Sequence, residues 1–210
     1  MKISYGITVC DERDELEQLL IHMRPLINEN DEIIVLRDLD KTNSDISRLL
    51  NNYKEIYNEQ LIVIDSRLNG DFATFKNQLL TWATGDYLFQ IDADEVPNPF
   101  LIEHIKKVLK MNLDVDCYYV PRVNKVEGLT QQHINQWGWR VDEKQRINFP
   151  DPQMRILKLN KGIKWKNKVH EVLDGYGNVA TLPYDDEDFC LYHHKSITKQ
   201  EKQNKFYETI

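Results

Sequence analysis

Three carboxylates follow an apolar stretch near the middle of the chain. The segment YLFQIDADE, residues 87–95, runs through mostly apolar residues and then reaches Asp92, Asp94 and Glu95. Because side chains alternate along a strand, Asp92 and Asp94 should point to the same side, where two carboxylates repel unless a cation or bound donors hold them together. Mg²⁺ and Mn²⁺ prefer oxygen ligands and often share substrate phosphates. We therefore interpret the pair as a candidate cation site, with a solvated acidic turn as the alternative.

Two stretches later in the chain offer groups that would complement such a site. In LYHHK, residues 191–195, the imidazole of His193 or His194 would be a suitable third ligand for Mn²⁺, and a hydrogen-bonded structural histidine is the alternative. In KVHEVL, residues 168–173, Glu171 stands beside apolar residues. A carboxylate whose pKa is tuned by burial and by its neighbours can act as a general base. The alternative is an ordinary glutamate at a strand edge.

Two further stretches would suit a phosphate and a sugar. Lys76 and Asn77 fall in the first turns of an expected helix, where backbone amides attract phosphate and lysine adds positive charge. Trp137 and Trp139 flank a glycine in QWGWR, residues 136–140, and exposed aromatic faces suit stacking against sugar rings. The respective alternatives are a solvated surface lysine and a core anchor for the loop.

The elements that must position these residues alternate between strands and helices in the first half of the chain. Short apolar, β-rich runs predict strands at residues 3–9, 31–38, 60–66 and 86–94. Helical spacing predicts helices at residues 14–27, 43–57 and 72–84, with Asn43 or Ser44 as an N-cap and Gly85 closing the third helix. This alternation indicates an α/β fold with a mostly parallel sheet and right-handed crossovers.

Ligands of such sheets bind at the carboxyl ends of the strands. Acidic residues follow several of the predicted strand ends: Asp11, Glu12, Asp38, Asp40, Asp65, Asp92 and Asp94. Several acids converging on one edge of one sheet are better evidence for a site than any one of them alone.

After residue 95 the pattern changes. A helix is expected at residues 97–112, and strands are expected at 115–123 and 152–159. The segment 124–151 between these strands is long, polar and dotted with aromatic residues, which predicts a mobile or substrate-facing loop. The stretches 163–173 and 188–195 follow, and a polar helix is expected at 196–210.

Composition narrows the class of protein. The 210 residues, 41% of them hydrophobic, suffice for one well-formed core. A formal net charge of -7 matches a phosphate backbone poorly, so we expect no nucleic-acid partner. The 3 cysteines have no metal-like spacing and indicate reduced thiols. We find no signal peptide and no run of ~20 apolar residues that would span a membrane. We expect a cytoplasmic protein, in some cases peripheral to a membrane-bound acceptor.

Taken together, these stretches resemble the inverting glycosyltransferases of family 2, and within them the branch of lipopolysaccharide-core glucosyltransferases. The most specific stretch is GDFATFKNQLLTWATGDYLFQIDADE, residues 70–95, and the resemblance extends over nearly the whole chain. It implies a GT-A type nucleotide-diphospho-sugar transferase fold with a mostly parallel central sheet flanked by helices. We expect one compact domain over 1–210, with a nucleotide-binding half at 1–95, an acceptor-facing half at 96–195 and a C-terminal helix at 196–210.

By position, the resemblance implies roles for individual residues. The nucleotide-diphosphate of the donor would contact Thr8, Cys10, Glu12, Arg13, Asp38, Lys76, Asp92 and Ala93. A Mn²⁺ or Mg²⁺ ion would be held by Asp92, Asp94 and His193, with Asp94 the more direct ligand. The acceptor would contact Trp137, Trp139 and Arg155, and Glu171 would be the catalytic base.

Three positions depart from the family pattern. Asp11 stands where the family usually has asparagine, and RDLDKTN, residues 37–43, replaces a turn rich in serine, threonine and glycine. Lys76 stands where arginine is common, and lysine lacks the planar fork that binds phosphate in bidentate fashion. These departures concern contacts to the nucleotide and leave the expected cation site and base unchanged.

The implied activity is metal-dependent transfer of a hexose, with glucose first, from a UDP-sugar to a hydroxyl of a glycan, a lipid-linked molecule or another acceptor. We expect no extra acceptor domain, which favours a small or exposed acceptor. One alternative is a sugar-phosphate nucleotidyltransferase, which normally has a glycine-rich basic loop where this chain has the acidic TVCDERDEL, residues 8–16. The other is an inactive module that binds a sugar or a metal.

Overall fold

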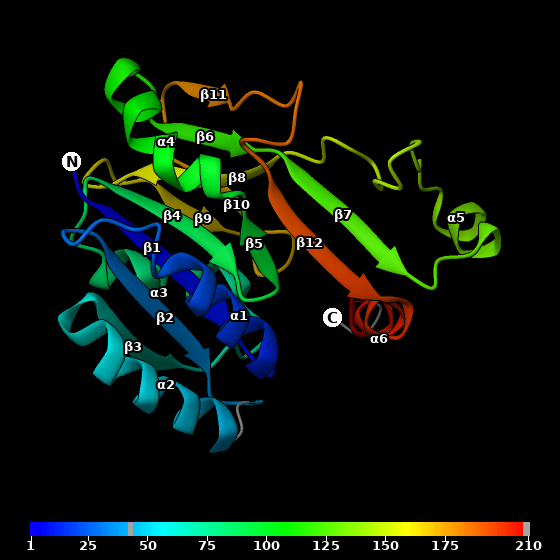
Figure 1. Cartoon of the computed structure of the whole chain (residues 1–210), viewed down its shortest axis with the longest axis horizontal. Coiled ribbons are helices and arrows are strands. Elements are labelled where there is room, and N and C mark those ends of the chain that lie inside the picture. Colours follow the sequence, from blue (N-terminus) through cyan, green and yellow to red (C-terminus); the bar gives the residue numbers. More distant parts are fainter. Residues whose placement is uncertain (42–43, 208–210) are drawn as a thin grey trace.

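Strands and helices alternate through the first half of the chain, as the sequence predicts. The computed structural model describes residues 1–41 and 44–207 (Figure 1). Its elements in the first half are β1 (Ile3–Val9), α1 (Arg13–Met23), β2 (Glu32–Asp38), α2 (Ser44–Tyr57), a 3-10 turn (Asn58–Gln60), β3 (Leu61–Ser66), α3 (Phe72–Trp82) and β4 (Tyr87–Asp92). The predicted strands therefore start and end within two residues of the observed ones.

The second half consists of shorter elements. They are β5 (Glu95–Pro97), α4 (Pro99–Met111), β6 (Cys117–Val120), β7 (Arg122–Glu127), α5 (Gln131–Trp137), β8 (Gln153–Lys158), β9 (Lys164–Lys166), β10 (Val172–Asp174), β11 (Val179–Thr181), β12 (Leu191–Ser196) and α6 (Ile197–Tyr207). Several of these strands have only three residues, which is too short for a periodic sequence pattern to reveal.

The central sheet is mostly parallel, which confirms the predicted fold class. Among the described residues it has seven strands in the order β11-β6-β8-β4-β1-β2-β3. β1 pairs in parallel with both β2 and β4, whereas β8 runs antiparallel to its neighbours β4 and β6. The carboxyl ends of β1, β2, β3 and β4 consequently meet at one edge of the sheet.

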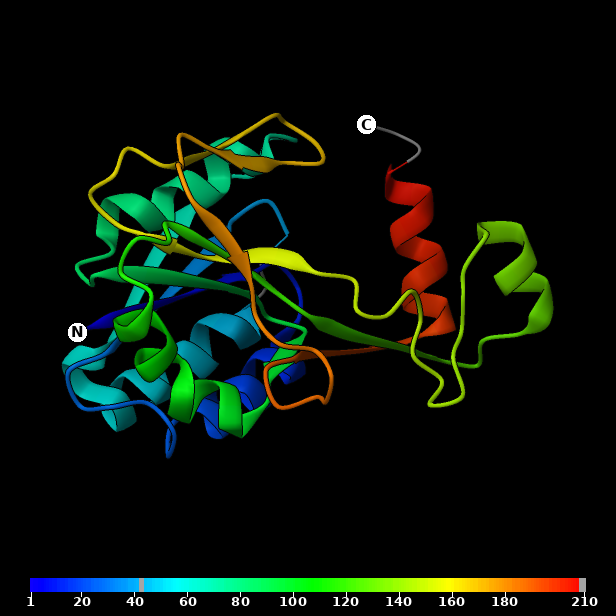
Figure 2. The same cartoon turned by 90° about the horizontal axis from the view of Figure 1, so that it is seen from above.

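Helices cover both faces of this sheet, as Figure 2 shows from above. Alternation along β2 sends Ile33 and Val35 into one apolar cluster and Ile34 and Leu36 into another. The first cluster is completed by α1, α2 and α4, and the second by α3 and the β9–β10 hairpin. Burial of both faces explains why β2 reads as a continuous apolar run.

A second sheet carries the chain away from this body. Its order is β5-β12-β7, with β12 parallel to β7 and antiparallel to β5. β7 and β12 extend side by side beyond the central sheet, and α5 and α6 follow their far ends (Figure 1). Residues of β7 and of β12, which are far apart in sequence, thereby come beside the carboxyl ends of β1, β2 and β4.

Two predictions for the second half were wrong. The strand expected at 115–123 is interrupted at Pro121, whose missing N–H cannot continue a ladder, so β6 joins the central sheet and β7 joins the second sheet. The loop expected at 124–151 contains the end of β7 and the helix α5, and it returns through bridges that join Ile147 to Asn124 and Val141.

Several helix ends also differ from the predictions. α1 ends at Met23, two residues before Pro25, and α3 ends at Trp82 rather than at Gly85. Gly85 is required for another reason, because a Cβ there would lie 2.8 Å from Ser4 Oγ. Asn98 caps α4 by accepting a hydrogen bond of 2.9 Å from the Phe100 N–H. The predicted cap at Asn43 lies outside the described residues.

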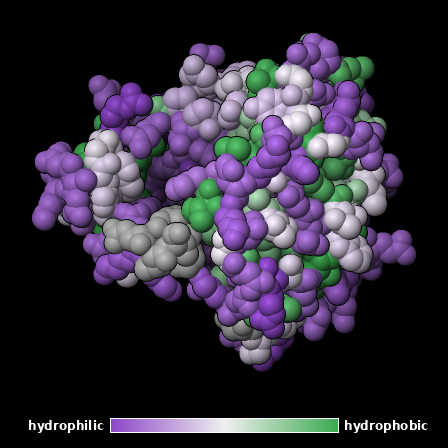
Figure 3. Space-filling model, turned by 180° about the vertical axis from the view of Figure 1, so that it is seen from behind, coloured by the Kyte–Doolittle hydropathy of each residue, from purple (hydrophilic) through white to green (hydrophobic). Residues whose placement is uncertain are grey.

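The face seen from behind is hollowed between the part that carries α5 and the main body, and hydrophilic side chains surround the hollow (Figure 3). Among the residues that the structure describes, no helix has the length and apolar character needed to cross a membrane.

Candidate functional site

A pocket of about 610 Å³ lies where the carboxyl ends of β1, β2 and β4 face β7 and β12. Its position agrees with the rule that ligands of parallel sheets bind at the strand ends. It is lined by most of the residues for which the sequence predicts a role: Thr8, Cys10, Glu12, Asp38, Lys76, Asp92, Ala93, Asp94, Trp139, Arg155, Glu171 and His193. Residues from Thr8 near the start of the chain to Gln203 near its end therefore share one cavity.

Two predicted site residues do not line this pocket. The guanidinium of Arg13 pairs with Asp14 and Glu17 on the surface of α1, at 2.7 and 2.6 Å. The ring of Trp137 stacks on His133 and is tilted against Trp139, with centroids 5.1 and 4.7 Å away. Of the acids that follow strand ends, Glu12, Asp38, Asp92 and Asp94 line the pocket, whereas Asp11, Asp40 and Asp65 do not.

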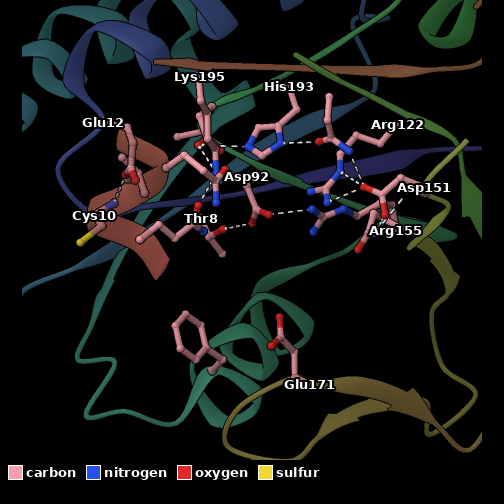
Figure 4. A pocket seen from close by; sticks show the side chains of 18 of the residues that line it. Thr8, Cys10, Glu12, Asp92, Arg122, Asp151, Arg155, Glu171, His193 and Lys195 are labelled. Carbon is pink, nitrogen blue, oxygen red and sulfur yellow. Dashed lines mark hydrogen bonds and ion pairs between the residues drawn. The ribbon is translucent and has the colours of Figure 1, made fainter. Parts of the chain in front are cut away.

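Asp92 is held from several directions at the end of β4 (Figure 4). One carboxylate oxygen accepts a hydrogen bond of 2.8 Å from the Thr8 hydroxyl, and the other accepts one of 2.7 Å from Arg155 Nη2. The ammonium of Lys76 lies 3.8 Å away. Burial opposes ionisation of Asp92, but the charges of Arg155 and Lys76 and the Thr8 hydrogen bond hold the pKa of its carboxyl well below the usual range.

Asp94 has an entirely different set of partners. Its Oδ2 lies 3.3 Å from His193 Nε2, 3.7 Å from Lys195 Nζ and 3.3 Å from Lys199 Nζ. Burial opposes its ionisation too, but contact with His193 and the two lysine charges hold the pKa of Asp94 well below its ordinary value. The alternation argument fails because β4 ends at Asp92 and the chain turns at Ala93. The predicted carboxylate pair thus consists of two separately held acids.

Arg155 lies beneath the acids and is only 5% exposed. Its Nη2 contacts Asp92 Oδ2 at 2.7 Å and Glu95 Oε1 at 2.5 Å, and its Nη1 contacts the amide oxygen of Gln90. Glu95 is fully buried and also pairs with Arg122 at 3.1 Å. The sequence predicts that Arg155 faces the acceptor, but its guanidinium is engaged in supporting the acids of the pocket floor.

This arrangement makes Arg155→Met a test of stability. We expect the free energy of unfolding to fall by about 3 kcal/mol, because both Glu95 and Asp92 lose the guanidinium of Arg155 as a buried charge partner. The measurement is unfolding in urea, where the midpoint should fall while the slope of the unfolding free energy against urea concentration stays unchanged. Arg48→Met is the matched control, since Arg48 pairs with Asp45 on the exposed face of α2 and surface pairs contribute less than about 1 kcal/mol. Equal midpoints for the two variants would contradict the supporting role.

Glu171 stands across the pocket from the Asp92 network (Figure 4). It precedes β10 on the hairpin that packs against α3, and its neighbour His170 adopts a positive φ of 53°. Its Oε1 accepts a hydrogen bond of 2.6 Å from Lys76 Nζ. Lys76 therefore lies between Glu171 and Asp92 and contributes positive charge to both sides of the cavity.

The loop after β1 closes another side of the pocket. The Glu12 carboxylate accepts hydrogen bonds of 2.9 and 3.2 Å from the N–H groups of Cys10 and Asp11, yet burial raises its pKa. Burial also raises the pKa of the Cys10 thiol to about 12, so this thiol stays protonated near neutral pH. Asp38 is 2% exposed and accepts hydrogen bonds of 3.0 and 3.1 Å from the N–H groups of Asp40 and Leu68, which fixes the turn after β2.

Asp94 and His193 are the side chains of the pocket that best fit a divalent cation. No group of three or more His, Cys, Asp and Glu side chains that would hold a metal occurs among residues 1–41 and 44–207. The pair of Asp94 and His193 nevertheless offers one carboxylate oxygen and one imidazole nitrogen 3.3 Å apart. Such a pair fits Mn²⁺ or Mg²⁺, which take remaining ligands from water and substrate phosphates. Asp92, the other predicted ligand, accepts hydrogen bonds from Thr8 and Arg155 but keeps lone pairs on both oxygens, so its part in the cation site stays a prediction.

The structure separates the two candidate histidines. His193 lines the pocket, whereas His194 on the opposite side of β12 is exposed and packs edge-on to Tyr192. The pocket wall also contains charged and polar side chains to which the sequence assigned no role, among them Arg122, Asn124 and Lys195. A signal existed for Lys195, because it is two residues beyond His193 and shares its side of the strand. Arg122 lies within the strand wrongly predicted at 115–123, and Asn124 begins the segment 124–151, where no pattern singled it out.

Comparison with known sequences gives a match to one family and to few relatives. The model of Glycosyl transferase family 2 matches residues 4–161. The chain is 22% identical over 186 residues to Glycosyltransferase SunS of Bacillus phage SPbeta. The matched residues are 87% of this chain and 37% of SunS. The chain is 24% identical over 147 residues to the ATP-dependent RNA helicase DHH1 of Saccharomyces cerevisiae, which covers 69% of this chain and 26% of the helicase. The chain thus spans much less than two thirds of either relative.

Comparison with solved structures agrees with the family match. TarS 1–349 from S. aureus in complex with UDP-GlcNAc gives a TM-score of 0.57 at 15% identity, covering 93% of this chain and 59% of that one. Mannosyltransferase PcManGT from Pyrobaculum calidifontis in complex with GDP-Man and Mn²⁺ gives 0.50 at 17% identity, covering 57% of this chain and 35% of that one. At these identities the likeness shows the fold alone, and it confirms the predicted GT-A type fold.

Proposed function

The chain belongs to glycosyl transferase family 2, and we propose that it transfers a hexose, with glucose as the first candidate, from a UDP-sugar to a hydroxyl group with inversion of configuration. The feature that carries this proposal is a single pocket in which Glu171 faces Asp92 and Asp94 across an open space. A base on one side and a charged site on the other are what an in-line displacement at a sugar carbon needs. TarS, bound to UDP-GlcNAc in its solved structure, supports a UDP-sugar as the donor.

The donor would lie along the strand ends of the first half. In this proposal Thr8, Cys10, Glu12 and Asp38 surround the nucleoside, and Lys76 and the backbone at Asp92 and Ala93 face the diphosphate. Lys76 is 7% exposed and already lies between two carboxylates. A diphosphate would give its ammonium a third negative partner, which favours binding of the donor.

A divalent cation would be held by Asp94 and His193. The Mn²⁺ that accompanies GDP-Man in the PcManGT structure supports this part of the proposal. When bound, the cation supplies positive charge against the diphosphate and so stabilises the leaving group. Lys195, buried in the same wall of the pocket with its Nζ 2.6 Å from Gln203 Oε1, adds charge there.

The reaction would proceed by one displacement. The Glu171 carboxylate takes the proton of the acceptor hydroxyl, the oxygen forms a bond to the anomeric carbon, and the bond from that carbon to the diphosphate oxygen breaks. UDP leaves with the electron pair of the broken bond. Attack from the face opposite the diphosphate inverts the configuration. Lys76, hydrogen-bonded to Glu171 Oε1 at 2.6 Å, orients the carboxylate until the hydroxyl arrives.

The acceptor would enter from the side of α5. Trp139 lines the pocket and packs on Trp137, so the pair presents an aromatic surface at the entrance, although only Trp139 reaches the cavity. The proposal includes the division of the chain into a nucleotide-binding half at 1–95, an acceptor-facing half at 96–195 and a C-terminal helix at 196–210. The narrower likeness to the lipopolysaccharide-core branch and a cytoplasmic, in part membrane-peripheral, location also belong to it.

The test is release of UDP from a panel of UDP-sugars, with Mn²⁺, with Mg²⁺ and with EDTA. We expect release from one sugar that depends on the metal, which would also name the donor. Calorimetric binding of UDP with metal but no release would indicate that the acceptor is missing. Absence of both binding and release, with a folded protein, would overturn the proposal.

Replacing each of the two histidines by alanine tests which one ligates the cation. We expect His193→Ala to weaken Mn²⁺ affinity about 10- to 100-fold, since the carboxylate of Asp94 alone remains. His194→Ala should leave the affinity unchanged, because that ring is exposed and directed away from the pocket. Calorimetric titration of Mn²⁺ in the presence of UDP measures both. The reverse order of the two effects would reassign the ligand.

A further inference from the structure

Asn124 on β7 lies directly beside the pair of Asp94 and His193. In the parallel ladder between β7 and β12, Asn124 and His193 are register partners. Asn124 Oδ1 lies 2.8 Å from His193 Nδ1, and Asn124 Nδ2 donates a hydrogen bond of 2.6 Å to Asp151 Oδ2. Asn124 also lines the pocket. The ring of His193 is thus held at both nitrogens, by Asn124 on one side and Asp94 on the other.

Asp151 determines which way the Asn124 amide points. Its Oδ2 also accepts hydrogen bonds from Arg122 Nε at 2.9 Å and Arg122 Nη2 at 2.7 Å. A carboxylate oxygen that takes three hydrogen bonds is an acceptor only, so the group that faces it must be the NH₂ of Asn124 and not its oxygen. The amide oxygen is therefore directed at His193, and turning the amide round would place two acceptors against each other.

The amide orientation in turn determines the tautomer of His193. Because Asn124 Oδ1 can only accept, the hydrogen of the neutral imidazole must be on Nδ1. Nε2 lies 3.3 Å from Asp94 Oδ2, so with a cation between them Nε2 presents its lone pair to it, and without the cation a second hydrogen on Nε2 is donated to Asp94. With the opposite tautomer, Nε2 would donate its hydrogen to Asp94 and would not be able to ligate a cation.

We propose that Asn124 is a positioning residue of the cation site, acting through the chain Arg122–Asp151–Asn124–His193 to present Nε2 as a ligand. The inference rests on the proposed function, because it takes Asp94 and His193 as the cation site. Hydrogen bonds of this kind fix the orientation of a ligating histidine, and their loss costs about 10- to 100-fold in metal affinity.

The experiment compares Mn²⁺ affinity, by calorimetry of the full chain in the presence of UDP, in three variants. Asn124→Leu removes both hydrogen bonds at similar volume and should raise the Kd for Mn²⁺ about 10- to 100-fold. Asn124→Asp keeps an acceptor for Nδ1–H but sets a carboxylate against Asp151 Oδ2, so it is combined with Asp151→Asn, and this double variant should recover most of that loss. Asn135→Leu, on the exposed surface of α5, is the matched control and should bind as the original chain does. Thermal unfolding of each variant reports whether it is folded.

A second readout follows the tautomer itself. Long-range ¹H–¹⁵N spectra of protein with ¹⁵N-labelled histidine, loaded with Mg²⁺ and UDP, should show His193 with hydrogen on Nδ1, and a mixture in Asn124→Leu. If the original chain binds Mn²⁺ and folded Asn124→Leu binds it equally well, the positioning role is wrong while the proposed function stands. If the original chain binds no Mn²⁺, the cation part of the proposed function fails and this inference fails with it.

Discussion

Glu171→Gln is expected to lower the rate of sugar transfer about 100- to 10,000-fold, the range over which a general base contributes to an enzymatic reaction. Glutamine has the same shape but cannot take a proton from the acceptor hydroxyl. Its amide oxygen still accepts the hydrogen bond from Lys76 Nζ, so the pocket should keep its form. Affinities for UDP and Mn²⁺ should remain near their original values, and the loss should fall on kcat rather than on KM.

The measurement is kcat for the transfer reaction beside calorimetric affinity for UDP with Mn²⁺. Asp174→Asn is the matched control, because Asp174 is an exposed acid on β10 of the same hairpin and pairs with Lys166 outside the pocket. It should transfer at the original rate. If Glu171→Gln also does so, the base lies elsewhere, and Asp151 is next, as a carboxylate that lines the pocket. Asp142, another acid of the segment 124–151, does not line it.

Asp94→Ala is expected to lower metal-stimulated turnover about 100- to 1,000-fold, similar to the loss of one group that stabilises developing charge. The change removes the only carboxylate of the proposed cation pair. It also leaves the ammonium groups of Lys195 and Lys199 without the oxygen that now lies 3.7 and 3.3 Å from them. Their repulsion should lower stability slightly, so the thermal midpoint must be measured beside the activity.

The measurement is UDP release as a function of Mn²⁺ concentration, with Asp65→Asn as the control. Asp65 also lies near the end of a strand of the sheet, but it pairs with Arg37 and lies outside the pocket. Its exchange should leave the Mn²⁺ dependence unchanged. Full Mn²⁺-dependent turnover by a folded Asp94→Ala protein would mean that the cation site is not at this aspartate.

The pattern of acids after strands predicted the place of the pocket but not its internal arrangement. Parallel strands joined by helices must end at the same edge, so Asp38, Asp92 and Glu12 come together whatever the rest of the chain does. Asp92 and Asp94 look equivalent in the sequence. In the structure one is held by Thr8 and Arg155 and the other by His193 and two lysines, because the strand ends between them.

The sequence by itself determined the alternating elements of residues 1–95, the parallel sheet and the edge at which chemistry takes place. That edge is where the pocket lies, and all three features follow from apolar periodicity and strand-end composition, which are local properties. The tertiary structure alone decided which residues of the second half reach that edge. Arg155, Asn124 and Lys195 arrive through pairing of short strands, and Glu171 arrives through packing of the β9–β10 hairpin on α3. Pairing between distant strands depends on many weak contacts that form together, so it cannot be predicted from any short stretch of sequence.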